Sequence, residues 1–316
     1  MLKQLLQTAL DHVRNGHPVM LVSVVRATGS TPRAAGALML ASPNGLLGGT
    51  VGGGLLEHRC LEIAAAGIAR PHRETFVLDN RKAGSLGMVC GGTSEILFTP
   101  LTDPAPLAAA LDAVRCHTAA WLCLPLDGGQ PMLSSDDSLP AHPAVTRRYG
   151  QEILALRLEN SVRVFILGGG HVSLELASLL HRLDFRHIVI DDRTAFCSPD
   201  RFPHAEQTLT APFAALSSVL NGTLTPTAAD AFCIMTRGHM GDTEAVRFAL
   251  QTPASYIGVM GSRRKRETMF ACLLADGFGE ARHRITTPIG LEIGAQTPSE
   301  IAVSVAAQLI AWRAAQ

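Results

Sequence analysis

Short apolar runs alternate with segments of helical periodicity from residue 164 to the C-terminus. In the clearest case the apolar run Val164-Phe165-Ile166-Leu167 leads through three glycines into apolar residues at helical spacing. Strands that alternate with helices in this way are typical of a parallel sheet with crossover helices. The predicted strands are 164–167, 187–190, 231–235 and 256–259, and the predicted helices are 174–183, 243–250, 262–274 and 297–312.

The first half of the chain has a different pattern. It opens with an amphipathic helix, and the segment Pro43-Asn44-Gly45 between two apolar runs predicts a β-hairpin. Further strands are predicted at 19–25, 95–98, 119–125 and 153–158, and helices near 55 and at 104–117. The fold class we expect is therefore α/β. A mixed α/β domain at 1–160 precedes a Rossmann-like parallel-sheet domain at 161–316.

Composition narrows the class of protein. With 316 residues, of which 47% are hydrophobic and 17% charged, the chain can bury two cores. Lys plus Arg equals Asp plus Glu at 27 each, which favours neither nucleic acid nor an anionic membrane as a partner. The first helix carries too many polar residues for a signal peptide. Seven cysteines without C-x-x-C pairs fit neither a disulfide framework nor a structural zinc site, so we expect reduced thiols in a cytoplasmic protein.

The turn Gly168-x-Gly170-x-x-Ser173 between a strand and a helix is typical of dinucleotide folds. Gly168 permits a tight turn, and Gly170 lets a pyrophosphate approach the amides at the helix start. Asp191 follows about 20 residues later, where a carboxylate can accept hydrogen bonds from ribose hydroxyls, and Arg193 could accept a 2′-phosphate. Ser173 replaces the third glycine of this pattern, and we expect it to loosen helix–strand packing slightly.

Two loops of the first half are candidates for a site. The glycines from Gly48 to Gly54 enter a helix and could hold a phosphate, although they could equally serve only tight packing. Residues 79–92 are expected to form a flexible loop in which Cys90 lies before two glycines. Its thiol would be approachable, and Arg81 and Lys82 could lower its pKa. A half-buried thiol without a task is the alternative.

Two more loops follow predicted strands and so lie at the carboxyl edge of the sheet, where ligands bind in such folds. In the first, His239 could contact a ligand or move a proton, and Asp242 is expected to cap the next helix. The second offers Ser262, Arg263 and Lys265 at a helix start. These side chains suit a second phosphate, or they form a solvated helix face.

Several of these segments together resemble one family, the xanthine dehydrogenase accessory factors, or XdhC/CoxI family. The resemblance covers nearly the whole chain. The matching segments are Val24–Arg33, Gly49–Glu57, Val89–Gly92, Gly168–Val172, Asp191–Arg193, Arg201–Pro203, Thr236–His239, Tyr256–Lys265 and Pro288–Leu291.

The resemblance implies a chaperone without turnover of its own that binds molybdenum cofactor, as molybdopterin or its dinucleotide form. It implies three partners: a cysteine desulfurase that supplies sulfur, an apo molybdenum hydroxylase of the xanthine dehydrogenase type, and a second copy of the chain in a homodimer. Cys90 would contact the molybdenum or its sulfur. The cofactor-binding candidates are Cys90, Gly52, Gly53, Gly54, Glu57, Gly168, Gly170, His171, Asp191, Arg193, His239, Ser262, Arg263 and Lys265.

The residues alone leave a different class open. Gly168, Gly170 and Asp191 also suit an NAD(P)-dependent oxidoreductase, with His239 as the proton donor. The nucleotide pocket could instead bind a dinucleotide form of the cofactor or a regulatory nucleotide. The oxidoreductase hypothesis leaves Cys90 without a role.

Overall fold

The structure is a computed structural model, which describes residues 2–67, 70–79, 89–116, 118–148, 150–158, 162–261 and 263–315. The side chains of Val89, Cys90, His239, Arg263, Arg264 and Ala281 lie outside the described part. The chain divides into two units, Met1–Glu159 and Asn160–Gln316, which are treated separately below.

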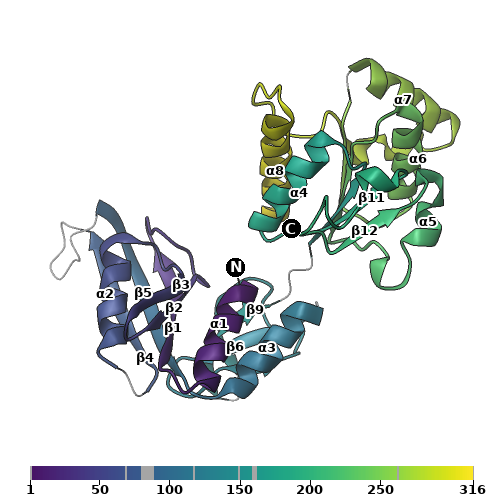
Figure 1. Ribbon diagram of the computed structural model, residues 1–316. Coiled ribbons are helices and arrows are strands. Elements are labelled where there is room, and N and C mark those ends of the chain that lie inside the picture. The colour runs from purple at the N-terminus through teal and green to yellow at the C-terminus, as the bar shows by residue number, and fades with distance from the viewer. Residues whose placement is uncertain are drawn as a thin grey trace. The chain divides into compact units, whose positions relative to one another are not determined.

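An antiparallel sheet of five strands, in the order β3-β2-β1-β5-β4, is the centre of the first unit (Figure 1). One face buries Met20, Val22 and Phe98 beneath Leu56 and Cys60 of helix α2, which begins at Gly54. The alternation of side chains along β1 places Leu21 and Val25 on the opposite face. The strands are β1 (Val19–Thr28), β2 (Leu38–Ser42), β3 (Gly45–Gly49), β4 (His72–Asp79) and β5 (Val89–Leu101), and α2 spans Gly54–Ala65.

That opposite face packs on two helices and a smaller sheet, ordered β7-β6-β9-β8. Leu6 and Leu10 of the first helix meet Leu107 and Leu111 of the third in one apolar cluster, which also takes in Leu122. The amphipathic pattern of the N-terminal segment therefore buries one helix face, as predicted. The elements are α1 (Leu2–Arg14), α3 (Pro104–Cys116), β6 (Trp121–Pro125), β7 (Met132–Ser134), β8 (Ala144–Arg148) and β9 (Gln151–Arg157).

The second unit is a parallel sheet of six strands in the order β12-β11-β10-β13-β14-β15. If these strands are numbered 1 to 6 along the chain, their order across the sheet is 3-2-1-4-5-6, which is the doubly wound Rossmann arrangement. The prediction of a mixed α/β fold with a C-terminal Rossmann-like sheet is confirmed. The strands are β10 (Arg163–Leu167), β11 (Arg186–Asp191), β12 (Gln207–Thr210), β13 (Asp230–Ile234), β14 (Tyr256–Val259) and β15 (Ile285–Thr286).

Helices cover both faces of this sheet. One face packs on α4 and α8 through Leu176, Leu180 and Leu309, and the other packs on α5, α6 and α7 through Leu216 and Val246. Burial on both faces explains why β10 and β13 are apolar throughout their centres. The helices are α4 (His171–Arg182), α5 (Leu216–Val219), α6 (His239–Leu250), α7 (Arg263–Ala275) and α8 (Pro298–Ala314). The predicted capping box of α8, between Thr297 and Glu300, is confirmed.

Two predictions about local structure are wrong. Cys90 does not lie in a loop with residues 91 and 92, because β5 begins at Val89 and pairs with β4 and β1 on its two sides. Residues 80–88 of that predicted loop lie outside the described residues. Helix α6 begins at His239 instead of Thr243, so Asp242 lies inside the helix.

Candidate functional site

The strand order reverses between β10 and β13, and the glycine turn after β10 lies at this switch point. Gly168 has φ 103°, and a Cβ atom there would overlap the carbonyl group of Met235 at the end of β13. Its amide donates to the Ile190 carbonyl at 2.7 Å. By contrast, no described atom lies within 4 Å of a Cβ built on Gly170. The turn therefore has no room for a side chain at Gly168, whereas there is open space beside Gly170. The next residue, His171, begins α4 and has an exposed side chain.

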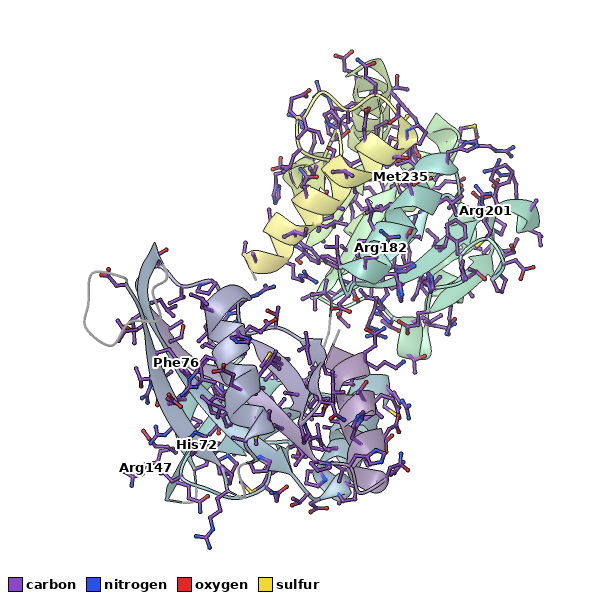
Figure 2. All side chains as sticks on the ribbon, turned by 60° about the vertical axis from the view of Figure 1, so that its left-hand side comes forward. His72, Phe76, Arg147, Arg182, Arg201 and Met235 are labelled. Atoms are coloured by element: carbon purple, nitrogen blue, oxygen red, sulfur yellow. The ribbon has the colours of Figure 1, made fainter. Side chains whose placement is uncertain are left out.

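Gly169, between these two, is held by Asp191, a predicted site residue, and by Phe196 and Arg201, which the sequence analysis did not assign to the site. Its amide donates to Asp191 Oδ2 at 2.7 Å, and its carbonyl accepts from Arg201 Nε at 3.2 Å. A Cβ at this position would overlap the carbonyl oxygen of Phe196. The segment after β11 thus packs directly on the glycine turn, and only glycine fits in the middle. Arg201 and Met235, which both contact the turn, are labelled in Figure 2.

Asp191 is buried at the end of β11, with 1% of the residue exposed. Its carboxylate accepts from the Gly169 amide, from the Arg193 amide at 2.9 Å, and from Nε and Nη2 of Arg193 at 2.9 and 3.0 Å. Burial raises the pKa of Asp191, but the bonds from Arg193 and Gly169 outweigh it and the pKa lies below its usual value. The carboxylate is therefore ionised and fully engaged within the protein.

Asp192, the next residue, lies between two cations. Its carboxylate is 3.5 Å from Arg193 Nε on one side and 3.5 Å from Arg237 Nη2 on the other. Arg237 follows β13 across the switch point, and its side chain is 66% exposed. The carboxyl edge of the sheet therefore carries, after β13, an exposed guanidinium that the sequence pattern did not single out.

The carboxyl end of β13 is braced by Asp242. This carboxylate is not that of the N-cap residue of α6, because the N-cap is Gly238 and Asp242 lies in the first turn of the helix. Asp242 instead accepts from the amide and hydroxyl of Thr236, at 3.1 and 2.6 Å, and its buried carboxylate forms an ion pair with the partly exposed Lys265 of α7. Lys265, a predicted phosphate ligand, thus neutralises a buried acid. His239 begins α6, but its side chain, that of Arg263 and all of Ser262 lie outside the described residues.

In the first unit, the loop that connects β1 to β2 contacts two separate glycine segments. A Cβ on Gly92 would lie 2.5 Å from the carbonyl oxygens of Thr28 and Ser30, and one on Gly52 would lie 2.5 Å from Cγ of Pro32. The β1–β2 loop therefore packs both against β5, the strand that carries Cys90, and against the glycine segment before α2. The structure describes the backbone of Cys90 in β5, whereas its side chain lies outside the described part.

The other glycines of these segments have open space beside them. Gly53 and Gly54 at the start of α2, and Gly91 beside Cys90, have positive φ angles and no described atom within 4 Å of a built Cβ. Glu57, a predicted cofactor-binding residue, makes two hydrogen bonds within the protein. It accepts hydrogen bonds from the Thr50 hydroxyl and from the Gly53 amide, the latter at 3.2 Å. It therefore holds the glycine loop against the first turn of α2.

The predicted residues thus form two sets, one in each unit. Cys90, Gly52, Gly53, Gly54 and Glu57 belong to the first set; Gly168, Gly170, His171, Asp191 and Arg193 belong to the second, and Lys265 lies with Asp242. A cavity of about 280 Å³ on α7, lined by Phe270 and Leu274 among others, includes none of them. Within the described ranges, no group of three or more His, Cys, Asp or Glu side chains is arranged to hold a metal ion. No described helix has the length and apolar character that a membrane crossing requires.

Two family models, one for each part of the XdhC family, match this chain. The model of the XdhC Rossmann domain matches residues 164–309, and that of the XdhC and CoxI family matches residues 12–79. A Bacillus subtilis (strain 168) protein, named as a probable xanthine dehydrogenase subunit, is 26% identical over 93% of both chains. The uncharacterized protein YqeB from Escherichia coli (strain K12) is 25% identical over 93% of this chain and 43% of its own length. A Bacillus halodurans crystal structure described as a xanthine dehydrogenase has the same fold, with a TM-score of 0.77 and 22% identity over 98% of this chain and 96% of that one.

Proposed function

The chain belongs to the XdhC and CoxI family, and from this premise we propose that it binds molybdenum cofactor and delivers it to an apo-hydroxylase. The cofactor, as molybdopterin or its dinucleotide form, is cargo, and the protein has no turnover of its own. The client is a hydroxylase of the xanthine dehydrogenase type. The Bacillus subtilis relative, 26% identical, carries the name of a xanthine dehydrogenase subunit, which supports this choice of client.

The observation that carries this proposal is the contact of separate glycine segments in the first unit. Gly52 and Gly92 pack against one loop, whereas Gly53, Gly54 and Gly91 face open space. The amides of Gly52 and Gly53 already donate to Thr50 and Glu57, so the amides that would bind a phosphate are those of the first turn of α2 from Gly54 on. Cys90 is the neighbour of the open Gly91. The bound cofactor supplies a phosphate, a hydrogen-bonding pterin and a soft metal centre. A thiolate at Cys90 is the ligand type that such a centre prefers.

The proposal includes two further partners. A cysteine desulfurase would supply the sulfur that the cofactor receives while it is held, and a second copy of the chain would complete a homodimer. Sedimentation of the purified protein tests the homodimer. Co-purification with a desulfurase, with and without cofactor, tests the other contact.

The decisive experiment measures equilibrium binding of isolated molybdenum cofactor to the wild type and to Cys90→Ala. We expect saturable binding to the wild type, weakened at least about tenfold in the variant because the soft ligand is lost. Cys116→Ala is the matched control, since Cys116 is an exposed cysteine on α3 of the same unit. The same preparations are then added to an apo-hydroxylase to measure its activation. Absence of cofactor binding together with absence of activation by the wild type would refute the proposal.

The alternative of an NAD(P)-dependent oxidoreductase gains no support from the described residues. Its ribose acceptor would be Asp191, whose carboxylate is already bonded to Gly169 and Arg193. Hydride transfer from a nicotinamide to any substrate would restore that alternative.

A further inference from the structure

The Asp191 carboxylate accepts as many hydrogen bonds as it has acceptor positions. An ionised carboxylate has about four lone-pair positions for hydrogen bonds. Two are taken by the backbone amides of Gly169 and Arg193, and two by Nε and Nη2 of the Arg193 guanidinium. A nucleotide ribose bound in the Rossmann manner needs two of these positions, one for each hydroxyl of its diol. In this chain the guanidinium of Arg193 occupies both.

Further contacts hold the guanidinium in this place. The central carbon of the Arg193 guanidinium lies 3.7 Å from the centre of the Phe196 ring, and its Nε is 3.5 Å from Asp192 Oδ1. Arginine is suited to both contacts, because its planar guanidinium stacks on aromatic rings and pairs with a carboxylate through two parallel hydrogen bonds. Phe196 is itself packed on Gly169 of the turn. The arginine is therefore part of the packed segment and is not a loose surface side chain.

We propose that Arg193 closes the ribose subsite of this Rossmann unit, so that the unit rejects NAD(H) and other ligands that present a ribose diol to Asp191. NADP(H) is rejected as well. To bind a 2′-phosphate, Arg193 would have to leave Asp191, and the phosphate would then lie beside a buried, unpaired carboxylate. Arg193 is thus the residue that determines specificity at this turn. The proposal concerns bonds within one unit and does not depend on the proposed function.

The test is equilibrium binding of NAD⁺, NADH and NADPH to the full-length protein by calorimetry. The wild type is expected to show no saturable binding of any of them below about 1 mM. In Arg193→Ala the two backbone bonds to Asp191 remain and two acceptor positions become free. This variant should therefore bind NAD⁺ or NADH at least about tenfold more tightly than the wild type.

Two controls separate this role from a general loosening of the loop. Arg201→Ala removes another arginine that lies near Phe196 but leaves all four bonds to Asp191, and it should gain no dinucleotide affinity. Arg193→Ala combined with Asp191→Asn should lose the gain, because the uncharged amide is a poor acceptor for the diol. Circular dichroism of each variant establishes that it is folded.

Two results would overturn the proposal. The first is wild-type protein that binds a nicotinamide dinucleotide tightly, with loss of binding in Asp191→Asn. The second is a folded Arg193→Ala that gains no affinity, because the subsite would then be closed by something other than Arg193. If Arg193→Ala does not fold, Arg193→Met takes its place, because it keeps the apolar stem of the side chain against Phe196. A folded Arg193→Met that gains no dinucleotide affinity would then overturn the proposal.

Discussion

Arg163 and Asp230 form a bidentate ion pair in the interior of the second unit, with Nε 3.2 Å from Oδ1 and Nη2 2.8 Å from Oδ2. The two residues stand directly opposite each other at the starts of β10 and β13, and their side chains are 5% and 1% exposed. Two of the three remaining guanidinium N–H groups donate to the carbonyls of Thr223 and Thr225, both at 2.9 Å. The buried charges thus face each other within a set of hydrogen bonds, and the pair ties the loop before β13 to the centre of the sheet.

The first prediction concerns this pair. Arg163→Met should lower the free energy of unfolding by about 3–5 kcal/mol, because it leaves the Asp230 carboxylate buried without its counter-charge. Urea denaturation measures the change. Arg186→Met is the control, since Arg186 pairs with Glu206 where both side chains are partly exposed, and it should cost less than about 1 kcal/mol. Equal losses in the two variants would contradict the stabilising role assigned to the buried pair.

The second prediction compares neighbouring glycines. Gly169→Ala should destabilise the protein by about 3 kcal/mol, because its Cβ would overlap the Phe196 carbonyl oxygen and the segment after β11 would have to move. Gly170→Ala should cost less than about 1 kcal/mol, because the backbone there has a φ of −69° and open space beside it. Thermal unfolding of both variants gives the comparison. A tolerated Gly169→Ala would mean that the segment does not pack on the turn as described.

The third prediction is a pH dependence that arises at His187. Burial lowers the pKa of this histidine, an effect only partly opposed by its contact with the Phe185 carbonyl at 3.4 Å. Below about pH 6.5 the unfolded chain therefore binds a proton that the folded chain does not, so stability falls as the pH falls. The slope contributed by His187 is up to about 1.4 kcal/mol per pH unit. In His187→Leu the difference in stability between about pH 7.5 and about pH 5.5 should shrink, and an unchanged difference would contradict the assignment.

Local patterns were enough to predict the centre of the Rossmann unit. The apolar strand β10, the glycine turn and α4 are contiguous in sequence, and their order determines where the turn lies. Two edge strands, β12 and β8, were missed because they carry little apolar signal. β12 is Gln207–Thr210, and β8 ends in two arginines. Such strands are defined by their neighbours in the sheet and not by their own pattern.

The site was predictable only as far as its contacts are local. Gly168 and Asp191 could be selected from spacing, but the guanidinium that occupies the Asp191 carboxylate depends on how the segment after β11 folds back. Asp242 was assigned to a helix cap because α6 was expected to begin four residues later than it does. Its partners Thr236 and Lys265 lie in the loop after β13 and in α7. Tertiary contacts of this kind leave no periodic signal in the sequence.

The last prediction tests Ser173, which stands where the dinucleotide pattern has its third glycine. Ser173 is 1% exposed, and its hydroxyl donates to the carbonyl of Gly168, which links the first turn of α4 to the glycine turn. Ser173→Gly removes this bond and adds backbone entropy to the unfolded chain, so it should lower stability by about 1–2 kcal/mol. The control is Ser218→Ala, which removes an exposed hydroxyl bonded to the Ala215 carbonyl and should cost at most about 0.5 kcal/mol. If serine merely loosens helix–strand packing, as the sequence pattern suggested, Ser173→Gly would raise the melting temperature. A fall in the melting temperature of Ser173→Gly, with Ser218→Ala unchanged, would show that the hydroxyl has replaced the close packing of the glycine by a hydrogen bond.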